Sequence, residues 1–201
     1  MRKLGRFAIL GSTALTFLLA SGSLSAQEAK SESGKSEEDW KAMKKEAKQG
    51  QVDAAAGAAL DQLLKENSKA KELYGKAYGW AAFDNLKLGF FFSGGGGKGV
   101  AVEKKTGKRT YMEMAAAGFG LAFGGKKYEV VFLFQDSQTF NSFIENGWQA
   151  QGNVNATAGE ANAGGQTAFV NGMAIYQISG TGLMANVDVS GTKYFKDKDL
   201  N

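Results

Sequence analysis

Short apolar runs separated by glycines dominate the middle of the sequence, residues 79–127. The apolar runs cover residues 80–83, 86–92, 100–102 and 115–123. Runs of this length are typical of strands and too short for most helices. Gly94 to Gly97 and Gly124-Gly125 supply the residue type that tight turns favour, and Thr106 to Lys108 indicates another turn. The pattern predicts a β-meander of two or three hairpins.

The second half contains one strand pattern that is apolar almost throughout. Residues 128–134, YEVVFLF, predict a strand buried on both faces. Residues 137–146 then place Phe140, Phe143 and Ile144 on one helical face, with Ser137 as the expected N-cap. Residues 172–179 and 183–190 predict a final hairpin.

The first half predicts three helices, over residues 39–49, 52–66 and 68–78, with Gly50 ending the first. Trp40 and Met43 lie among lysines in the first helix. One interpretation is that both side chains pack against the rest of the domain. The other is that they lie on a membrane surface.

The beginning of the sequence has the pattern of a secretory signal peptide over residues 1–26. Three basic residues precede an apolar stretch from Phe7 to Ala20, and small residues near Ala26 favour cleavage before Gln27. The alternative is an uncleaved anchor. Residues 27–38 predict a disordered leader, residues 39–196 a single domain, and residues 197–201 a frayed tail. We therefore expect export, to the periplasm or the outer membrane if the source is bacterial.

Several motifs occur in a characteristic order. Leu88-Gly89 precedes an aromatic run and Lys98-Gly99-Val100, and Gly118-Phe119-Gly120 and Phe123-Gly124-Gly125 precede the strand over residues 128–134. From about Asp53 to Lys196, this order resembles the SYLF-domain family of lipid-binding proteins. The resemblance implies phospholipid binding. Fungal relatives bind actin, but an exported protein would not meet actin, so actin is not expected as a partner.

Charge is distributed unevenly along the chain. The sequence has 24 basic and 20 acidic residues, and removal of the signal peptide takes away three basic and no acidic residues, so the net charge falls to +1. The basic character of the full sequence is therefore no argument for nucleic acid. Residues 84–127 carry a net charge of +5 and residues 128–192 a net charge of −5. The basic residues of the first segment are Lys87, Lys98, Lys104, Lys105, Lys108, Arg109, Lys126 and Lys127.

These basic residues are the candidate headgroup-binding site. In a meander, alternate turns share one end of the sheet, so we expect Lys98 with Lys126-Lys127 at one end and Lys104 to Arg109 at the other. The alternative is ordinary solvated turn lysines. Free N–H groups of the glycine-rich turn would add an anion site. That turn is formed by Gly94, Gly95, Gly96, Gly97 and Gly99.

Other chemistry is poorly supported by the residues. Gly94, Gly96 and Gly99 match a dinucleotide-binding spacing, but the pattern that follows is a strand and not the required helix. The sequence has no histidine and no cysteine, so the commonest general base and metal ligands are missing. Glu103 and Glu113 are better explained as partners of nearby lysines than as an acid and base pair. No cofactor and no metal are expected.

The sequence therefore predicts an α+β protein with N-terminal helices packed on a curved, Gly/Phe-rich antiparallel sheet, for which a barrel-like form is an option. The expected function is non-catalytic recognition of anionic phospholipid headgroups through basic turns. The alternative is a structural or protein-interaction component of the cell envelope, with residues 149–168 contacting a protein partner.

Overall fold

The computed structural model describes residues 36–89, 92–119, 124–149, 168–179, 182–184 and 191–201. The helices are α1 (Glu37–Glu66), α2 (Ser68–Lys76) and α3 (Ser137–Asn146). The strands are β1 (Gly79–Gly89), β2 (Phe92–Glu103), β3 (Arg109–Phe119), β4 (Gly124–Phe134), β5 (Trp148–Gln149), β6 (Met173–Ser179), β7 (Gly182–Met184) and β8 (Thr192–Lys196). The predicted α+β class is confirmed.

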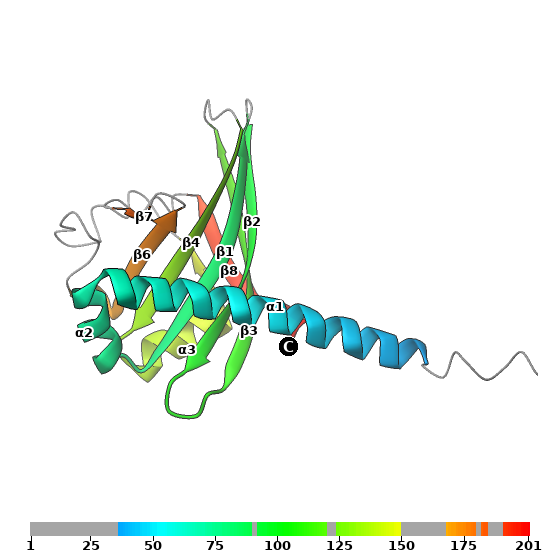
Figure 1. Ribbon diagram of the computed structural model, residues 1–201, viewed down its shortest axis with the longest axis horizontal. Helices are drawn as coiled ribbons and strands as arrows, with labels where there is room; N and C mark the ends of the chain where they lie inside the picture. Colours follow the sequence, from blue (N-terminus) through cyan, green and yellow to red (C-terminus); the bar gives the residue numbers. More distant parts are fainter. Residues whose placement is uncertain (1–35, 90–91, 120–123, 150–167, 180–181, 185–190) are drawn as a thin grey trace, which may run out of the picture. The chain divides into compact units, whose positions relative to one another are not determined.

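The described strands form one antiparallel, twisted sheet in the order β5-β8-β3-β2-β1-β4-β6-β7 (Figure 1). Strands β1, β2 and β3 are consecutive neighbours, as a meander requires. Strand β4 pairs with β1 and not with β3, so the predicted meander is wrong from its fourth strand onward. This arrangement puts β1 between β2 and β4 in the middle of the sheet.

Glycines 94–97 lie inside β2, where they pair with β1 on one side and β3 on the other. The predicted glycine-rich turn is therefore wrong, and Gly124-Gly125 likewise begin β4. Close approach explains two of the glycines. A Cβ atom on Gly97 would collide with the Asn85 side chain, and one on Gly99 would collide with the Phe83 ring. Between two partner strands, a glycine run is held extended by hydrogen bonds on both sides.

Both faces of the sheet are covered in the lower part of the molecule. On β4, Tyr128, Val130, Phe132 and Phe134 join the core under α3, whereas Val131 and Leu133 join the core under α1 and α2. The prediction of a strand buried on both faces is confirmed. We call the two sides of the sheet the α3 face and the α1 face.

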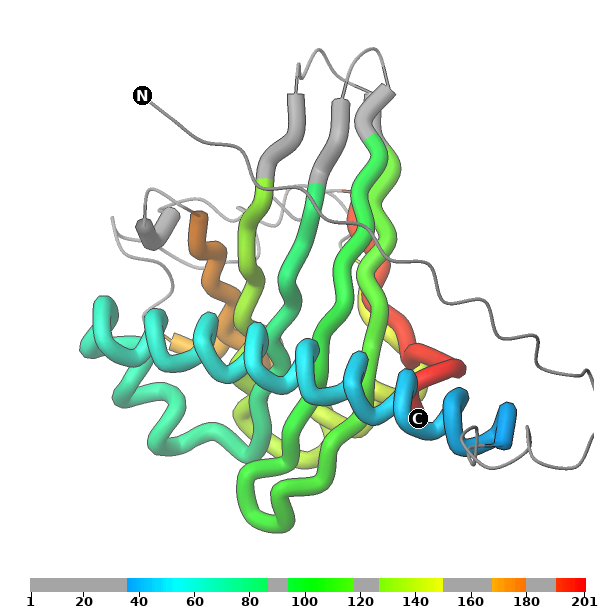
Figure 2. The backbone as a smooth tube through the Cα atoms, turned by 45° about the vertical axis from the view of Figure 1, so that its right-hand side comes forward, coloured from blue at the N-terminus to red at the C-terminus, as the bar shows by residue number. Residues whose placement is uncertain are grey.

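Helix α1 is one continuous helix of 30 residues, so the predicted end at Gly50 is wrong. A glycine inside a helix costs about 1 kcal/mol relative to alanine, and the good helix formers on both sides outweigh that cost. The helix crosses the α1 face of the sheet, and its first half continues beyond the sheet (Figures 1 and 2). Among the described helices, none has the length and apolar character needed to cross a membrane.

One helix end and the last residues of the chain also differ from expectation. The N-cap of α3 is Asp136, whose side chain accepts a hydrogen bond from the Thr139 backbone N–H, and not Ser137. Residues 197–201 are not frayed. Leu200 is buried, and the Asn201 side chain hydrogen-bonds to the backbone of Tyr111 at 2.8 and 3.0 Å.

Candidate functional site

Strands β1 to β4 extend well past α1, and their extensions form one end of the sheet (Figures 1 and 2). In register, Gly89 pairs with Gly124 and Phe92 pairs with Phe119, so all four strands reach the same end. We call this extension, from the level of Asp84 to these strand ends, the wing.

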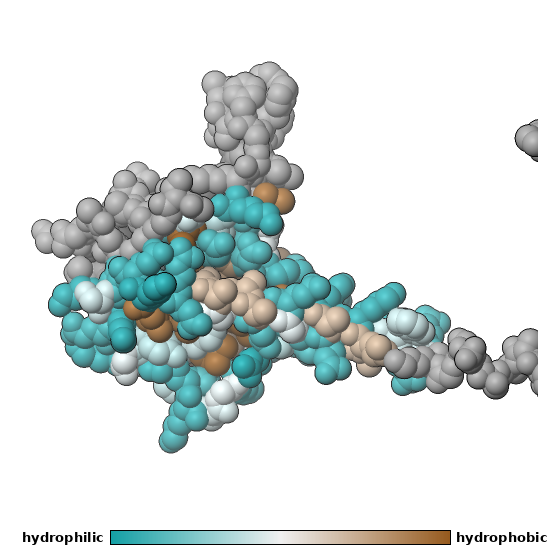
Figure 3. Space-filling view, viewed as in Figure 1, coloured by the Kyte–Doolittle hydropathy of each residue, from teal (hydrophilic) through white to brown (hydrophobic). Residues whose placement is uncertain are grey.

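Small residues form much of the α1 face of the wing. Gly94 and Gly96 of β2 and Ala115 and Ala117 of β3 are exposed there. Leu86 of β1 lies beside them and is 39% exposed. Most of the surface seen in the same view as Figure 1 is hydrophilic, with apolar patches along α1 and near the wing (Figure 3). The wing therefore offers a weakly polar face that no described helix covers.

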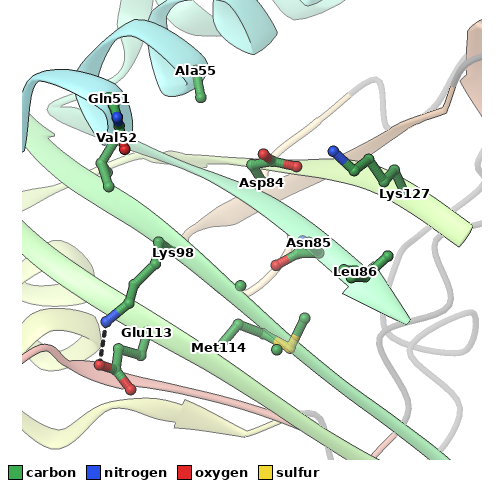
Figure 4. Close-up of a pocket in the computed structure, with 12 residues that line it drawn as sticks. Gln51, Val52, Ala55, Asp84, Asn85, Leu86, Lys98, Glu113, Met114 and Lys127 are labelled. Atoms are coloured by element: carbon green, nitrogen blue, oxygen red, sulfur yellow. Dashed lines mark hydrogen bonds and ion pairs between the residues drawn. The ribbon is translucent and has the colours of Figure 1, made fainter. Parts of the chain in front are cut away.

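A pocket of about 560 Å³ lies where α1 meets the base of the wing (Figure 4). Helix α1 contributes Gln51, Val52 and Ala55 to its wall. The sheet contributes Asp84, Leu86, Gly96, Lys98, Glu113 and Lys127, among others. The pocket thus combines apolar contacts with side chains of both charges.

A row of charged residues crosses the sheet at this level. Glu129 of β4, Asp84 of β1, Lys98 of β2 and Glu113 of β3 are successive cross-strand neighbours. Strand alternation puts all four on the α1 face, because Val131, Ala82, Val100 and Tyr111 at positions two residues away belong to the core under α1.

Lys98 is fully engaged by two carboxylates. Its Nζ donates to Glu113, as Figure 4 shows, and to Asp197 Oδ2 at 2.6 Å. The Asp197 side chain is completely buried. Burial alone would lower the pKa of Lys98, but the hydrogen bonds to Asp197 and Glu113 outweigh it and raise the pKa. Lys98 is thus an internal tie between β2, β3 and residues 197–201, and it is not in a turn as predicted.

Asp84 and Lys127 also line this pocket, but they are not tied to charged partners as Lys98 is (Figure 4). Both side chains are exposed, and within the described residues neither makes an ion pair. Glu129 is half-buried next to them. Its pKa is raised, first because burial disfavours the carboxylate and second because Asp84 is negative.

The other predicted site residues fall at two opposite ends of the sheet. The β2–β3 hairpin carries Lys104, Lys105, Lys108 and Arg109, far from the wing end (Figure 1). Lys87 and Lys126 occupy paired register positions on β1 and β4, in the wing. Their side chains lie outside the described part of the chain. The predicted basic residues therefore form no single surface.

Two of the hairpin residues have structural partners. Lys104 Nζ donates to the Tyr74 backbone carbonyl at the end of α2 and lies 4.4 Å from the centre of the Tyr74 ring. Burial lowers the pKa of Lys104. Arg109 Nε lies 3.4 Å from Asp53 Oδ1 of α1. Lys105 and Lys108 are exposed.

Comparison with known proteins gives matches over most of this domain. The family model described as "Ysc84: Las17-binding protein actin regulator" matches residues 115–201. Beta cell expansion factor A of Aeromonas veronii is 44% identical over 149 residues, which are 74% of this chain and 57% of that protein. This chain belongs to the SYLF family. The resemblance found in the sequence motifs is confirmed.

Two yeast proteins also match the SYLF chain. Protein YSC84 and LAS seventeen-binding protein 3 of Saccharomyces cerevisiae are each 34% identical over 137 residues, or 63% of this chain. The matches cover 29% and 30% of the yeast proteins. The SYLF chain thus spans little more than half the length of the bacterial relative and less than a third of the yeast ones. The SYLF homologues implicate lipid- or actin-related binding at the level of the family.

Sequence reasoning missed Asp84 and Leu86 of the SYLF pocket, and it missed Glu129, which lies beside the pocket as the cross-strand neighbour of Asp84. The signal for the two carboxylates was present. Glu129 interrupts a strand that is otherwise apolar, and Asp84 interrupts another, at positions that alternation assigns to the covered face. An acidic residue in such a position needs a partner or a ligand. Asp197 was missed because it was placed in a frayed tail.

Proposed function

We propose that this SYLF chain binds phospholipid membranes with the wing, through headgroup phosphates, and performs no chemistry of its own. The observation that carries the proposal is the combination, at one end of the sheet, of an exposed face of small residues with three lysines. Lys87 and Lys126 are register partners, and Lys127 is opposite Leu86.

Electrostatics favours this end over the hairpin end. Each basic residue near an anionic bilayer contributes on the order of 1 kcal/mol, so three lysines contribute about 3 kcal/mol together. At the hairpin end, Lys104 and Arg109 are held by Tyr74 and Asp53, and Glu103 offsets one of the two charges of Lys105 and Lys108. Lys98, which was expected to share this role, is neutralised by Asp197 and Glu113.

Apolar contact favours the same end. Leu86 and the exposed glycines and alanines can approach a bilayer closely, because they carry little polar side-chain volume. In the sequence, the residues that join the four strand ends are Phe90-Phe91 and Gly120 to Phe123, all apolar or glycine. The described part of the wing therefore combines Lys127 with Leu86 and exposed glycines and alanines, which is the composition of a membrane-surface contact.

The first half of α1 is the other surface with membrane-like composition. Trp40 is 52% and Met43 42% exposed, which favours the membrane interpretation of these two residues over packing in the core. Lys45 and Gln49 of the same segment hydrogen-bond to the backbone of Asn201 and Leu200. These contacts fix the segment to the domain at its base.

Vesicle co-sedimentation tests the proposal. The mature protein should bind vesicles of phosphatidylcholine with phosphatidylglycerol better than vesicles of phosphatidylcholine alone. Binding should weaken as salt rises from about 0.05 to 0.5 M, because the Debye length shrinks several-fold over that range. The Lys126→Glu/Lys127→Glu variant should bind at least about tenfold more weakly at low salt, since reversing two charges removes two attractive contributions and adds repulsion.

Lys105→Glu/Lys108→Glu is the matched control, because it makes the same change of net charge at the opposite end of the sheet. Equal losses in the two variants would mean that only total charge matters, and the wing proposal would be wrong. Equal binding to both kinds of vesicle at all salt concentrations would point to apolar attachment, with Trp40 and Met43 as the next candidates.

A further inference from the structure

We propose that the pocket at the base of the wing holds the headgroup of one phospholipid with a primary ammonium, a phosphoethanolamine group, with its phosphate at Lys127 and its ammonium at Asp84 and Glu129. This inference rests on the proposed membrane contact of the wing and adds a headgroup preference to it. The order of charges along the wing, the lining of the pocket and the size of the pocket support this inference.

Three zones follow one another from the strand ends toward α1. Nearest the ends lie the exposed Gly94 and Ala117, then the row in which Leu86 is opposite Lys127, and then Asp84 opposite Glu129. A phospholipid whose chains remain in the bilayer presents its groups in the same order: acyl chains and glycerol, then phosphate, then the terminal ammonium. The charges of the wing therefore complement this headgroup from end to end.

The inner part of the pocket selects a positive group. Lys98 is the other cation that lines the pocket, and its charge is balanced by Glu113 and Asp197. Asp84 in the pocket wall and Glu129, its cross-strand neighbour beside the pocket, therefore leave a net negative charge at this depth. A headgroup that carries only phosphate would meet repulsion there, whereas an ammonium would relieve the mutual repulsion of the two carboxylates.

The lining favours a primary ammonium over a trimethylated one. A primary ammonium donates three hydrogen bonds, and carboxylates are strong acceptors for it. Quaternary ammonium groups are usually held in aromatic cages, whereas the described walls of this pocket are formed by aliphatic, amide, small and charged side chains. The volume of about 560 Å³ lies in the range of small-ligand sites.

The test uses the full mature chain and two measurements. In the first, vesicles contain a fixed fraction of phosphatidylglycerol, and phosphatidylcholine is replaced stepwise by phosphatidylethanolamine. We expect the affinity to rise about tenfold, and this gain should disappear in Asp84→Asn. Asp61→Asn is the matched control, since it makes the same charge change at an exposed position of α1 and should keep the gain.

The second measurement removes effects of lipid packing, because it uses headgroups without acyl chains. In ¹H–¹⁵N spectra, glycerophosphoethanolamine should shift the amide signals of residues 84–86 and 127–129, and glycerophosphocholine should not. Equal shifts with both compounds, or shifts elsewhere only, would overturn the inference. So would a phosphatidylethanolamine gain that Asp84→Asn retains.

The outcomes separate this inference from the proposed function. If phosphatidylglycerol vesicles still bind through Lys126 and Lys127 but phosphatidylethanolamine adds nothing, the headgroup site is wrong and the membrane contact stands. If neither kind of vesicle binds, both proposals are wrong.

Discussion

Asp197 shows how one buried carboxylate can fix the end of a domain. Its side chain has no exposure, and its oxygens accept hydrogen bonds from Lys98 Nζ and from the backbone N–H groups of Asp199 and Leu200. Burial alone would raise the pKa of Asp197, but the hydrogen bonds from Lys98 and from these two N–H groups lower it below its usual value of 3.8. Residues 197–201 are ordered because this carboxylate links them to β2.

Asp197→Ala should lower the free energy of unfolding by about 2 kcal/mol at pH 7, because Lys98 loses a charged partner and two backbone donors lose their acceptor. A carboxylate with a lowered pKa stabilises the folded state above the unfolded-state pKa and loses this effect as the pH falls through the folded-state value. The difference between variant and parent should therefore shrink below about pH 3.8.

Urea denaturation across this pH range measures the effect. Asp199→Ala, at an exposed position in the same segment, is the control and should change stability little. A loss that is independent of pH would show that the carboxylate charge is not what stabilises residues 197–201.

At the scale of elements, the strongly patterned segments were predictable and the weakly patterned ones were not. Residues 137–146 were predicted as they occur, and residues 128–134 were predicted as a strand that in fact begins earlier, at Gly124, because their apolar spacing matches only one kind of element. Strand β8 was missed: Thr192–Lys196 is short and charged, and its partner β3 lies about 80 residues earlier in the sequence. The glycines of β2 were assigned to a turn because glycine suits both a turn and a close strand contact. The neighbouring strands decide between the two, and their positions cannot be read from local sequence.

Val131→Asp tests the central position of β4. Val131 is fully buried and packs in the core under α1, so an unpaired charge there should cost several kcal/mol, enough to unfold a domain of ordinary stability. Ala117→Asp introduces the same side chain at an exposed position of β3, on the α1 face of the wing, and should have little effect. Circular dichroism melting distinguishes the two, and a Val131→Asp variant that melts like the parent would rule out a buried β4.

At the scale of the whole molecule, the fold divides the charge that the sequence concentrates. Residues 84–127 carry +5 in sequence, but the antiparallel strands send Lys104 to Arg109 to one end and Lys87, Lys126 and Lys127 to the other. The division between two ends was predicted from the alternation of turns, whereas the position of Lys98 inside β2, opposite Asp84 and Glu113, was not. The mixed-charge pocket depends on β4 pairing with β1, which brings Glu129 next to Asp84.

Export, which the sequence pattern predicts, would place the wing near lipid outside the cytoplasm. The pattern of residues 1–26 predicts a mature chain that begins at Gln27 or within about three residues of it. Sequencing the first residues of the protein recovered from the cell envelope or the medium measures this. Recovery of an intact chain that still begins with Met1 and remains fixed in the membrane would contradict the prediction.

The orientation of the sheet on a bilayer is the central claim, and site-specific fluorescence tests it most directly. The sequence has no cysteine, so Ala117→Cys in the wing and Lys105→Cys in the opposite hairpin each provide one labelling site for an environment-sensitive dye. On addition of anionic vesicles, the dye at position 117 should shift to shorter emission wavelength and be quenched by lipid-borne quenchers, while the dye at position 105 should not respond. A response at position 105 alone, or equal responses at both positions, would contradict the account.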